Sequence, residues 1–391
     1  MKRVIISLLA SICALTAWAQ GGNTGTGGSD GDYASLSERV LNLEKKGDQF
    51  NFFFNYGSSF QVSDAGGDWG AAFRAKQLRL EVKGSFGDHL SYRLRHRMNK
   101  SQAAMSEENF AKATDIMMVS WKFNDKFTLM GGKMCQFWGG YEFDENPMYI
   151  YQYSDMVDYM DNFLAGVALA WYPLKGQEFV FNVTNSYSGK FASEYGAAAR
   201  TMDGLYLKGA AFPLAYIVNW NGSLFGGLLT TRWSLGSYTQ AQSNDGSKLF
   251  HDRMVFLGQS LNLPKLQWYF DYMGAFESLD RLRIVTGDLG GGYATDVRYN
   301  SFVTKLNWHF TPGFNLMLKG MYETAGLASM DAYKRVSLGY VGALEYYPLK
   351  DQDFRVFVAY VGRDCKYEGV RLDNYHVNRL ELGFMYRIKA Y

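Results

Sequence analysis

Basic residues in two neighbouring segments of this chain are spaced two or four positions apart. Arg79 and Lys83 stand in the first segment, and Arg93, Arg95 and Arg97 stand in the second. A spacing of two places side chains on the same face of a β-strand. Surfaces lined by Arg and Lys favour the passage of anions through a pore. These residues therefore predict one sheet face that attracts anions.

The same alternation assigns further basic residues to this face. They are Lys122, Lys305, Lys319, Arg335, Arg355, Arg363, Arg379 and Arg387. The acidic residues assigned to the same face are Glu81, Glu323, Glu345, Asp353 and Glu381. The excess of basic residues predicts an Arg/Lys-lined lumen that prefers anions, while pairing of each arginine with an acid would leave only mild selectivity. Both interpretations remain open at this point.

The acidic residues that balance this excess are expected in loops. The chain has 40 Lys and Arg and 38 Asp and Glu, so removing Lys2 and Arg3 with an export signal leaves 38 of each. A chain of zero net charge gives no reason to expect a nucleic-acid partner. Many acids stand in stretches without strand alternation, and they are Asp144, Glu145, Asp155, Asp158, Asp161, Asp280 and Asp288.

A long aromatic stretch follows one of the predicted strands. Residues 137–163 include Tyr149, Tyr151, Tyr153 and Asp155. Loops in contact with water are usually polar, so we expect this one to fold into a barrel and narrow it. The alternative is an extracellular loop that packs on its neighbours.

Catalytic and metal chemistry find little support in the sequence. The five histidines are His89, His96, His251, His309 and His376, and none lies in a recognisable nucleophile motif or in metal-ligand spacing. We therefore predict no enzyme activity, no cofactor and no metal. Cys135 and Cys365 are far apart in sequence, and we do not expect a disulfide between them.

The elements that carry these residues read as strands. From Asn378 to the end, Leu380, Leu382, Phe384 and Tyr386 alternate with charged or small residues. Similar alternation gives sixteen candidate strands from about residue 49, one of them over 207–219. Sixteen is an even number, as bacterial barrels require. Short turns alternate with longer connections, among them 61–72, 240–250 and 325–332, and this alternation is typical of periplasmic turns and extracellular loops. The 17% aromatic content suits aromatic girdles at the membrane boundaries. The predicted fold is all-β, a transmembrane antiparallel barrel of about sixteen strands.

The N-terminal region predicts export. Residues 1–19 read as a signal peptide that ends in an A-x-A cleavage site. Residues 20–32 read as a Gly-rich linker, residues 33–47 as a short periplasmic helix with coiled-coil spacing, and residues 48–391 as the barrel porin. The helix is interpreted either as a frayed amphipathic helix or as a trimerising stalk.

Three stretches resemble the family of phosphate-selective porins O and P, in the form common among Bacteroidetes. They are residues 73–100, the turn KFNDKF and the segment FDENPMYIYQYSDM. The resemblance implies a sixteen-stranded outer-membrane porin, usually trimeric, whose third loop folds inward. In that family an arginine ladder and central lysines draw phosphate down the pore. Arg93, Arg95 and Arg97 resemble part of the ladder, whereas the central lysines have no residue-by-residue match.

The predicted function is passive diffusion of small hydrophilic solutes across the bacterial outer membrane. The expected partners are the lipid bilayer, small anionic solutes and two further copies of the chain in a homotrimer. A second hypothesis is an outer-membrane adhesin or structural barrel that binds through its long extracellular loops.

Overall fold

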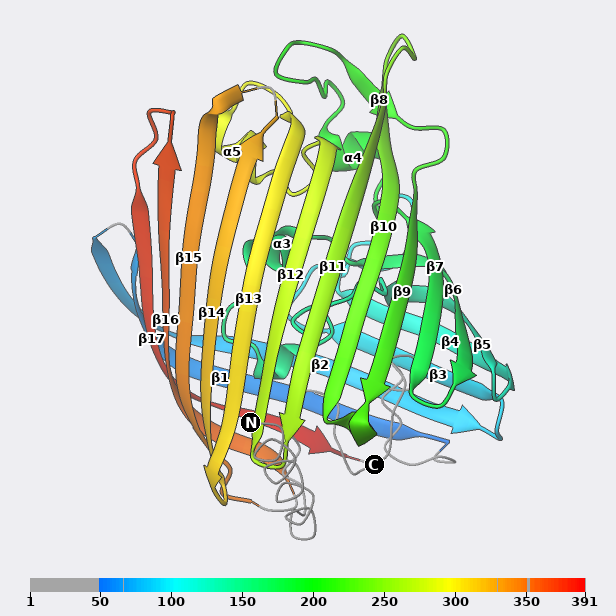
Figure 1. Cartoon of the computed structure of the whole chain (residues 1–391), viewed down its shortest axis with the longest axis vertical. Coiled ribbons are helices and arrows are strands. Elements are labelled where there is room, and N and C mark those ends of the chain that lie inside the picture. Colours follow the sequence, from blue (N-terminus) through cyan, green and yellow to red (C-terminus); the bar gives the residue numbers. More distant parts are fainter. Residues whose placement is uncertain (1–48, 66, 329, 350–351, 391) are drawn as a thin grey trace, which may run out of the picture.

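A computed structural model describes residues 49–390, except 66, 329, 350 and 351, and its strands form a closed antiparallel barrel (Figure 1). The barrel closes because β1 pairs with β2 along one edge and with β17 along the other. The predicted signal peptide, linker and coiled-coil helix lie outside the described residues. The strands are β1 (Asn51–Ala65), β2 (Asp68–Phe86), β3 (Leu90–Arg97), β4 (Thr114–Asn124), β5 (Phe127–Cys135), β6 (Phe163–Leu174), β7 (Gln177–Asn185), β8 (Leu207–Gly209), β9 (Leu214–Leu224), β10 (Leu229–Ser243), β11 (Leu249–Leu263), β12 (Leu266–Leu279), β13 (Thr295–Thr311), β14 (Phe314–Leu327), β15 (Met330–Tyr346), β16 (Asp353–Glu368) and β17 (Tyr375–Lys389). The short helices are η1 (Pro147–Tyr149), α3 (Asp155–Tyr159), α4 (Phe191–Tyr195), η2 (Phe225–Gly227) and α5 (Ile284–Leu289).

Sixteen of the described strands form the barrel wall, and β8 is a short addition to it. β8 and β9 pair with successive parts of β10 and are separated by a break that contains Pro213. Proline cannot donate a ladder hydrogen bond. The prediction of one continuous strand over 207–219 was therefore wrong, although the barrel has the predicted sixteen strands.

Side chains alternate between a buried and an exposed face along the strands. In β4, Ile116 and Met118 are buried, whereas Met117, Val119 and Trp121 are each about half exposed. Large apolar side chains on the exposed face suit contact with lipid, because apolar and polar faces alternate in membrane barrels. None of the helices in the described part of the chain is long and apolar enough to span a membrane.

Several connections are shorter than the sequence indicates. The predicted loop at 61–72 is a continuous hairpin in which Phe60 pairs with Phe73 and Asp64 pairs with Trp69. The predicted loop at 325–332 is likewise mostly strand, because β14 and β15 extend toward each other. Polar residues in these segments resembled loop composition, but regular backbone pairing continues through them. The regular alternation of short and long connections is thus broken at these hairpins.

Candidate functional site

The segment 136–162, between β5 and β6, crosses the barrel interior and contacts strands far from its own. The Tyr149 hydroxyl donates a hydrogen bond to Asp353 at 2.5 Å, and the Tyr151 hydroxyl donates one to Glu345 at 2.6 Å. Arg379 on β17 donates a hydrogen bond to the Tyr151 carbonyl at 2.8 Å. Figure 1 shows α3, which belongs to this segment, within the barrel outline behind the front strands. We call residues 136–162 the interior loop.

Aromatic packing holds the interior loop against the barrel wall. Trp138 and Phe143 both pack on Phe256 of β11, with ring centroids 5.2 and 5.9 Å apart. Tyr151 packs edge-on against Phe357 of β16 at 4.9 Å. Burying large aromatic side chains is among the strongest apolar contributions to packing. This explains why the sequence of the loop is aromatic.

Carboxylates of the interior loop meet basic residues of the wall. Glu142 pairs with Lys319 of β14, and Glu145 pairs with Lys305 of β13. Asp155, at the first position of α3, pairs with both Arg335 and Arg363. Glu145 and Asp155, two of the acids that the sequence assigned to loops, thus neutralise basic residues inside the barrel, as Glu142 does.

Wall carboxylates also accept hydrogen bonds from the loop backbone. Asp271 of β12 accepts from the amides of Tyr141 and Glu142, each at 2.8 Å. Glu323 of β14 accepts from the amide of Asp155 at 2.6 Å. Hydrogen bonds to charged groups contribute about 1.5–3 kcal/mol each. These bonds fix the loop at both of its ends.

Two phenols of the loop act as neutral donors. Burial raises the pKa of Tyr149 and of Tyr151 well above the ordinary value, and the carboxylates of Asp353 and Glu345 raise it further. A neutral phenol keeps its proton and can donate it to a carboxylate. These two predicted constriction residues therefore anchor the loop through their hydroxyl groups.

A cluster of arginines occupies the inner face of β2 and β3. Arg97 lies 2.8 Å, Arg95 3.4 Å and Arg79 3.8 Å from the single carboxylate of Asp115. Arg93 pairs with Glu81 at 2.7 Å. We call these four arginines the arginine cluster. With two carboxylates for four guanidiniums, the group carries an excess of positive charge.

The arginine cluster faces the interior loop through Tyr153. Burial raises the pKa of Tyr153, and the guanidiniums of Arg79 and Arg95 act in the opposite direction. Arg95 also lies over the ring of Phe163, with its guanidinium carbon 5.1 Å from the ring centroid. Arg95 Nε is buried and makes no hydrogen bond in the described residues, despite its 3.4 Å approach to Asp115.

The other basic residues predicted on the inner face have different surroundings. Lys83 and Arg387 both lie over the ring of Phe53. Arg355 is fully buried beside Glu345 and over the ring of Tyr149. Arg379 pairs with Glu381 at 2.5 Å.

Lys122 differs from the other predicted lining residues. Its side chain is 44% exposed and pairs with Asp125, three residues further on, at 2.6 Å. It stands close to the β4–β5 turn, apart from the arginine cluster.

Two residues of the site escaped the sequence analysis because a bulge interrupts the alternation. Between β3 and β4, Arg95 lies opposite Ile116 and His96 lies opposite Thr114, so Asp115 is an extra residue in β4. Between β1 and β2, Gly57 lies opposite Gln77 and Ser58 lies opposite Ala75, so Lys76 is an extra residue in β2. Its ammonium group forms an ion pair with Glu381. A β-bulge re-aims a side chain that strict alternation would place on the other face.

Further buried pairs were missed for a different reason. Lys133 pairs with Glu108 of the β3–β4 connection, and Arg232 pairs with Asp144 of the interior loop. These contacts join segments far apart in sequence, and no local signal indicates them. In the described residues, no group of three or more His, Cys, Asp or Glu side chains could hold a metal ion, and Cys135 and Cys365 are both free thiols.

Comparison with solved structures identifies the architecture. The outer-membrane channel DcaP of Acinetobacter baumannii superposes with a TM-score of 0.61 at 11% identity, covering 88% of this chain and 99% of that one. OmpF of Salmonella typhi, in complex with daunomycin, gives a TM-score of 0.58 at 11% identity, with 88% and 98% covered. A trimer form of OmpT from Vibrio cholerae gives 0.53 at 9% identity, with 88% and 100% covered. At such identities the likeness shows the fold.

A family model supplies the classification. No curated protein matches the sequence significantly. The model for phosphate-selective porins O and P, however, matches residues 50–388, nearly the whole chain. A closed sixteen-stranded barrel with an outer-membrane channel fold agrees with that match and indicates a channel rather than an enzyme. The chain belongs to the family of phosphate-selective porins O and P.

Proposed function

We propose that this porin lets small hydrophilic solutes diffuse passively through its barrel and that it prefers anions, phosphate among them. The observation that carries the proposal is the arginine cluster, in which four guanidiniums share two carboxylates. A low-dielectric wall focuses the field of such charges on the water inside a pore. The excess charge would raise the local concentration of anions.

The proposed path runs between the arginine cluster and the interior loop. The loop fills the side of the interior next to β11–β17, where aromatic contacts and ion pairs fix it. Tyr153 is the loop residue whose electrostatic partners include Arg79 and Arg95. We propose that Tyr149, Tyr151, Tyr153 and Asp155 set the narrowest part by holding the loop in place.

The proposal extends to assembly and export. We propose a homotrimer in the outer membrane, which the OmpT structure in a trimer form supports by analogy of fold. We also propose that residues 1–19 are removed during export, since their sequence fits a signal peptide.

Conductance of the purified protein in planar bilayers tests the proposal. We expect stable open steps, a reversal potential in a KCl gradient that reports anion preference, and block of the chloride current by added phosphate. The variant Arg93→Ala/Arg95→Ala/Arg97→Ala should lose the preference and the block. Open steps without charge preference would refute the anion selectivity, and folded protein without any steps would refute the porin function.

A further inference from the structure

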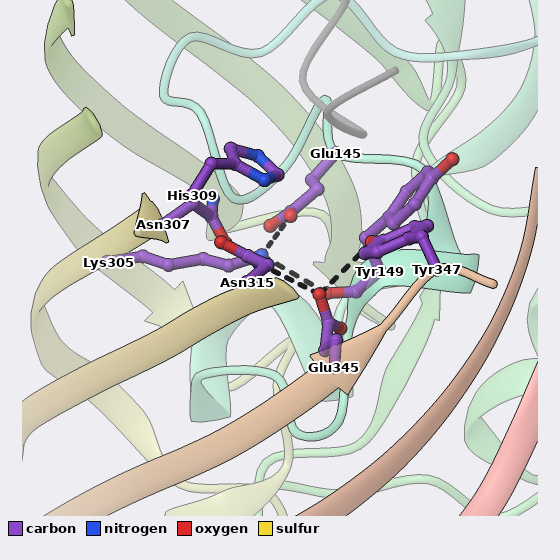
Figure 2. A pocket seen from close by; sticks show the side chains of 8 residues that line it. All are labelled: Glu145, Tyr149, Lys305, Asn307, His309, Asn315, Glu345 and Tyr347. Atoms are coloured by element: carbon purple, nitrogen blue, oxygen red, sulfur yellow. Dashed lines mark hydrogen bonds and ion pairs between the residues drawn. The ribbon is translucent and has the colours of Figure 1, made fainter. Parts of the chain in front are cut away.

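A small polar cavity lies inside the barrel near the ends of β13–β15, away from the arginine cluster. Its volume is about 10 Å³, which is room for one water-sized group. Figure 2 shows the side chains that line it converging from the interior loop and from three wall strands. The lining residues are Glu145, Tyr149, Lys305, Asn307, His309, Asn315, Glu345 and Tyr347.

Most donors at this cavity already have acceptors. Lys305 bonds to Glu145 and to the Tyr149 carbonyl. The Asn315 amide donates to Glu345 at 2.8 Å, and Tyr347 donates to the same carboxylate at 3.1 Å. These bonds leave acceptor atoms, rather than donors, facing the free space.

Two polar atoms at the cavity have no hydrogen-bond partner among the residues that the structure describes. They are Asn315 Oδ1, whose residue is 3% exposed, and His309 Nε2. The amide oxygen can only accept, and a neutral imidazole accepts at Nε2 when its proton is on Nδ1. A buried acceptor without a partner costs about 1–3 kcal/mol. Both atoms would be satisfied by a ligand that donates hydrogen bonds.

The charges that border the cavity favour a cation. Its lining holds two carboxylates, Glu145 and Glu345, and one ammonium, Lys305. Behind the lining, Arg355 pairs with Glu345 at 3.1 Å, and the carboxylate of Asp353 accepts a hydrogen bond from Tyr149. Carboxylates thus outnumber basic groups around the cavity. A protonated amine supplies three donors and one positive charge in a head group of about the size of a water molecule. An anion, by contrast, would meet acceptors and carboxylates on most sides.

We propose that this cavity binds the protonated amino group of solutes that enter the lumen. The inference rests on the proposed porin function. Because β16, β17 and β1 separate β13–β15 from β2–β3 in the strand ring, the lumen would hold an anion-attracting wall and a separate ammonium site. Such an arrangement suits solutes that carry both charges, such as amino acids and short peptides.

The first test measures block of single-channel current by methylammonium chloride. Tetramethylammonium, which has no N–H donor and a larger head, is the control ion at the same ionic strength. We expect methylammonium to reduce the current and tetramethylammonium to leave it unchanged. In His309→Leu and in Asn315→Leu, the half-blocking concentration should rise about tenfold, the effect of losing one charge-assisted hydrogen bond.

Matched variants separate loss of the site from loss of the fold. His309→Gln keeps a hydrogen-bond acceptor at this position, so methylammonium should still block most of the current. His251→Leu makes the same substitution at an exposed histidine on β11. Methylammonium should block the current through this variant as strongly as it blocks the current through the unmodified protein. Equal block by the two ammonium ions, or equal block in His309→Leu and His251→Leu, would overturn the proposal.

A second readout does not depend on conductance. We expect methylammonium, but not tetramethylammonium, to raise the unfolding temperature of the detergent-solubilised protein, because a ligand bound only by the folded state stabilises it. Absence of channel steps together with this stabilisation would refute the porin function and leave the ammonium site standing. Channel steps without any methylammonium effect in either assay would refute the site alone.

Discussion

The two sides of the barrel interior use basic residues in different ways. On β13–β16, Lys305, Lys319, Arg335 and Arg363 meet carboxylates that the interior loop brings to them. On β2 and β3, by contrast, the four guanidiniums of the arginine cluster share the carboxylates of Asp115 and Glu81. The first side is neutralised within the chain, whereas the second keeps a surplus of positive charge. Counting basic residues alone therefore overstates the net positive charge of the inner face.

We infer that the neutralised basic residues position the interior loop, whereas the surplus of positive charge on β2 and β3 acts on selectivity. A buried ion pair contributes little net stability compared with apolar packing, but breaking it leaves an uncompensated charge at a large cost. On the loop-covered side, the pairs thus fix the position of a loop. On the arginine-cluster side, guanidiniums outnumber carboxylates, and this surplus is the charge that we propose acts on solutes. Variants on the loop-covered side should therefore change mainly the stability of the protein, whereas variants of the arginine cluster should change mainly the reversal potential and the phosphate block.

The largest effect is expected from Asp155→Asn. This change removes the carboxylate shared by Arg335 and Arg363. Breaking a buried pair costs about 3–5 kcal/mol, and the loop should lose its position at α3. We expect a lower unfolding temperature and a larger, noisier single-channel conductance. Asp158→Asn is the matched control on the same helix, since Asp158 is exposed. Equal effects of the two variants would contradict the anchoring role of Asp155.

A smaller effect on the same side is expected from Tyr151→Phe. The phenol donates to Glu345 at 2.6 Å, and burial keeps it neutral by raising its pKa. Loss of a hydrogen bond to a charged group should destabilise the fold by about 1.5–3 kcal/mol, with the ring packing retained. Denaturant unfolding measures this change. Tyr159→Phe, at an exposed tyrosine of α3, should be neutral, and a similar loss there would argue against a specific anchor.

Removing two basic residues from either side should change a different property of the protein. Arg95→Gln/Arg97→Gln should weaken phosphate block about tenfold, or ~1.4 kcal/mol, because it takes two charges from the unbalanced cluster. Lys305→Gln/Lys319→Gln should mainly lower stability, because it leaves Glu145 and Glu142 without their partners. Reversal potential and unfolding temperature are measured for both. A larger selectivity change in the lysine variant would invert our assignment of the two sides.

The sequence predicted the barrel because alternation is a local property of each strand. It also predicted the inward loop, since the aromatic content of residues 137–163 is unusual for a segment in water. Alternation failed at Asp115 and Lys76, where one extra residue in a strand changes the face to which side chains point. Proline at 213 similarly divided a predicted strand.

The charge balance of the interior could not be read from the sequence for another reason. Glu142, Glu145 and Asp155 lie on a loop whose course depends on packing against strands more than one hundred residues away in the chain. No local pattern says which lysine or arginine each acid will meet. Alternation therefore predicts which basic residues share a face but leaves their pairing open.

The smallest effect is expected from Lys122→Ala. Lys122 is a basic residue at an inward position by alternation, like those of the arginine cluster, but it is 44% exposed and pairs with Asp125 near a turn. Exposed ion pairs contribute about 0–1 kcal/mol and are screened by salt. We expect an unchanged reversal potential, unchanged phosphate block and a stability change within about 0.5 kcal/mol. Arg95→Ala, at a position 7% exposed, is measured beside it and should shift the reversal potential. If Lys122→Ala shifted it as far, the field that selects anions would extend to the end of the barrel, and the contrast would lie between the loop-covered side and the whole remaining wall.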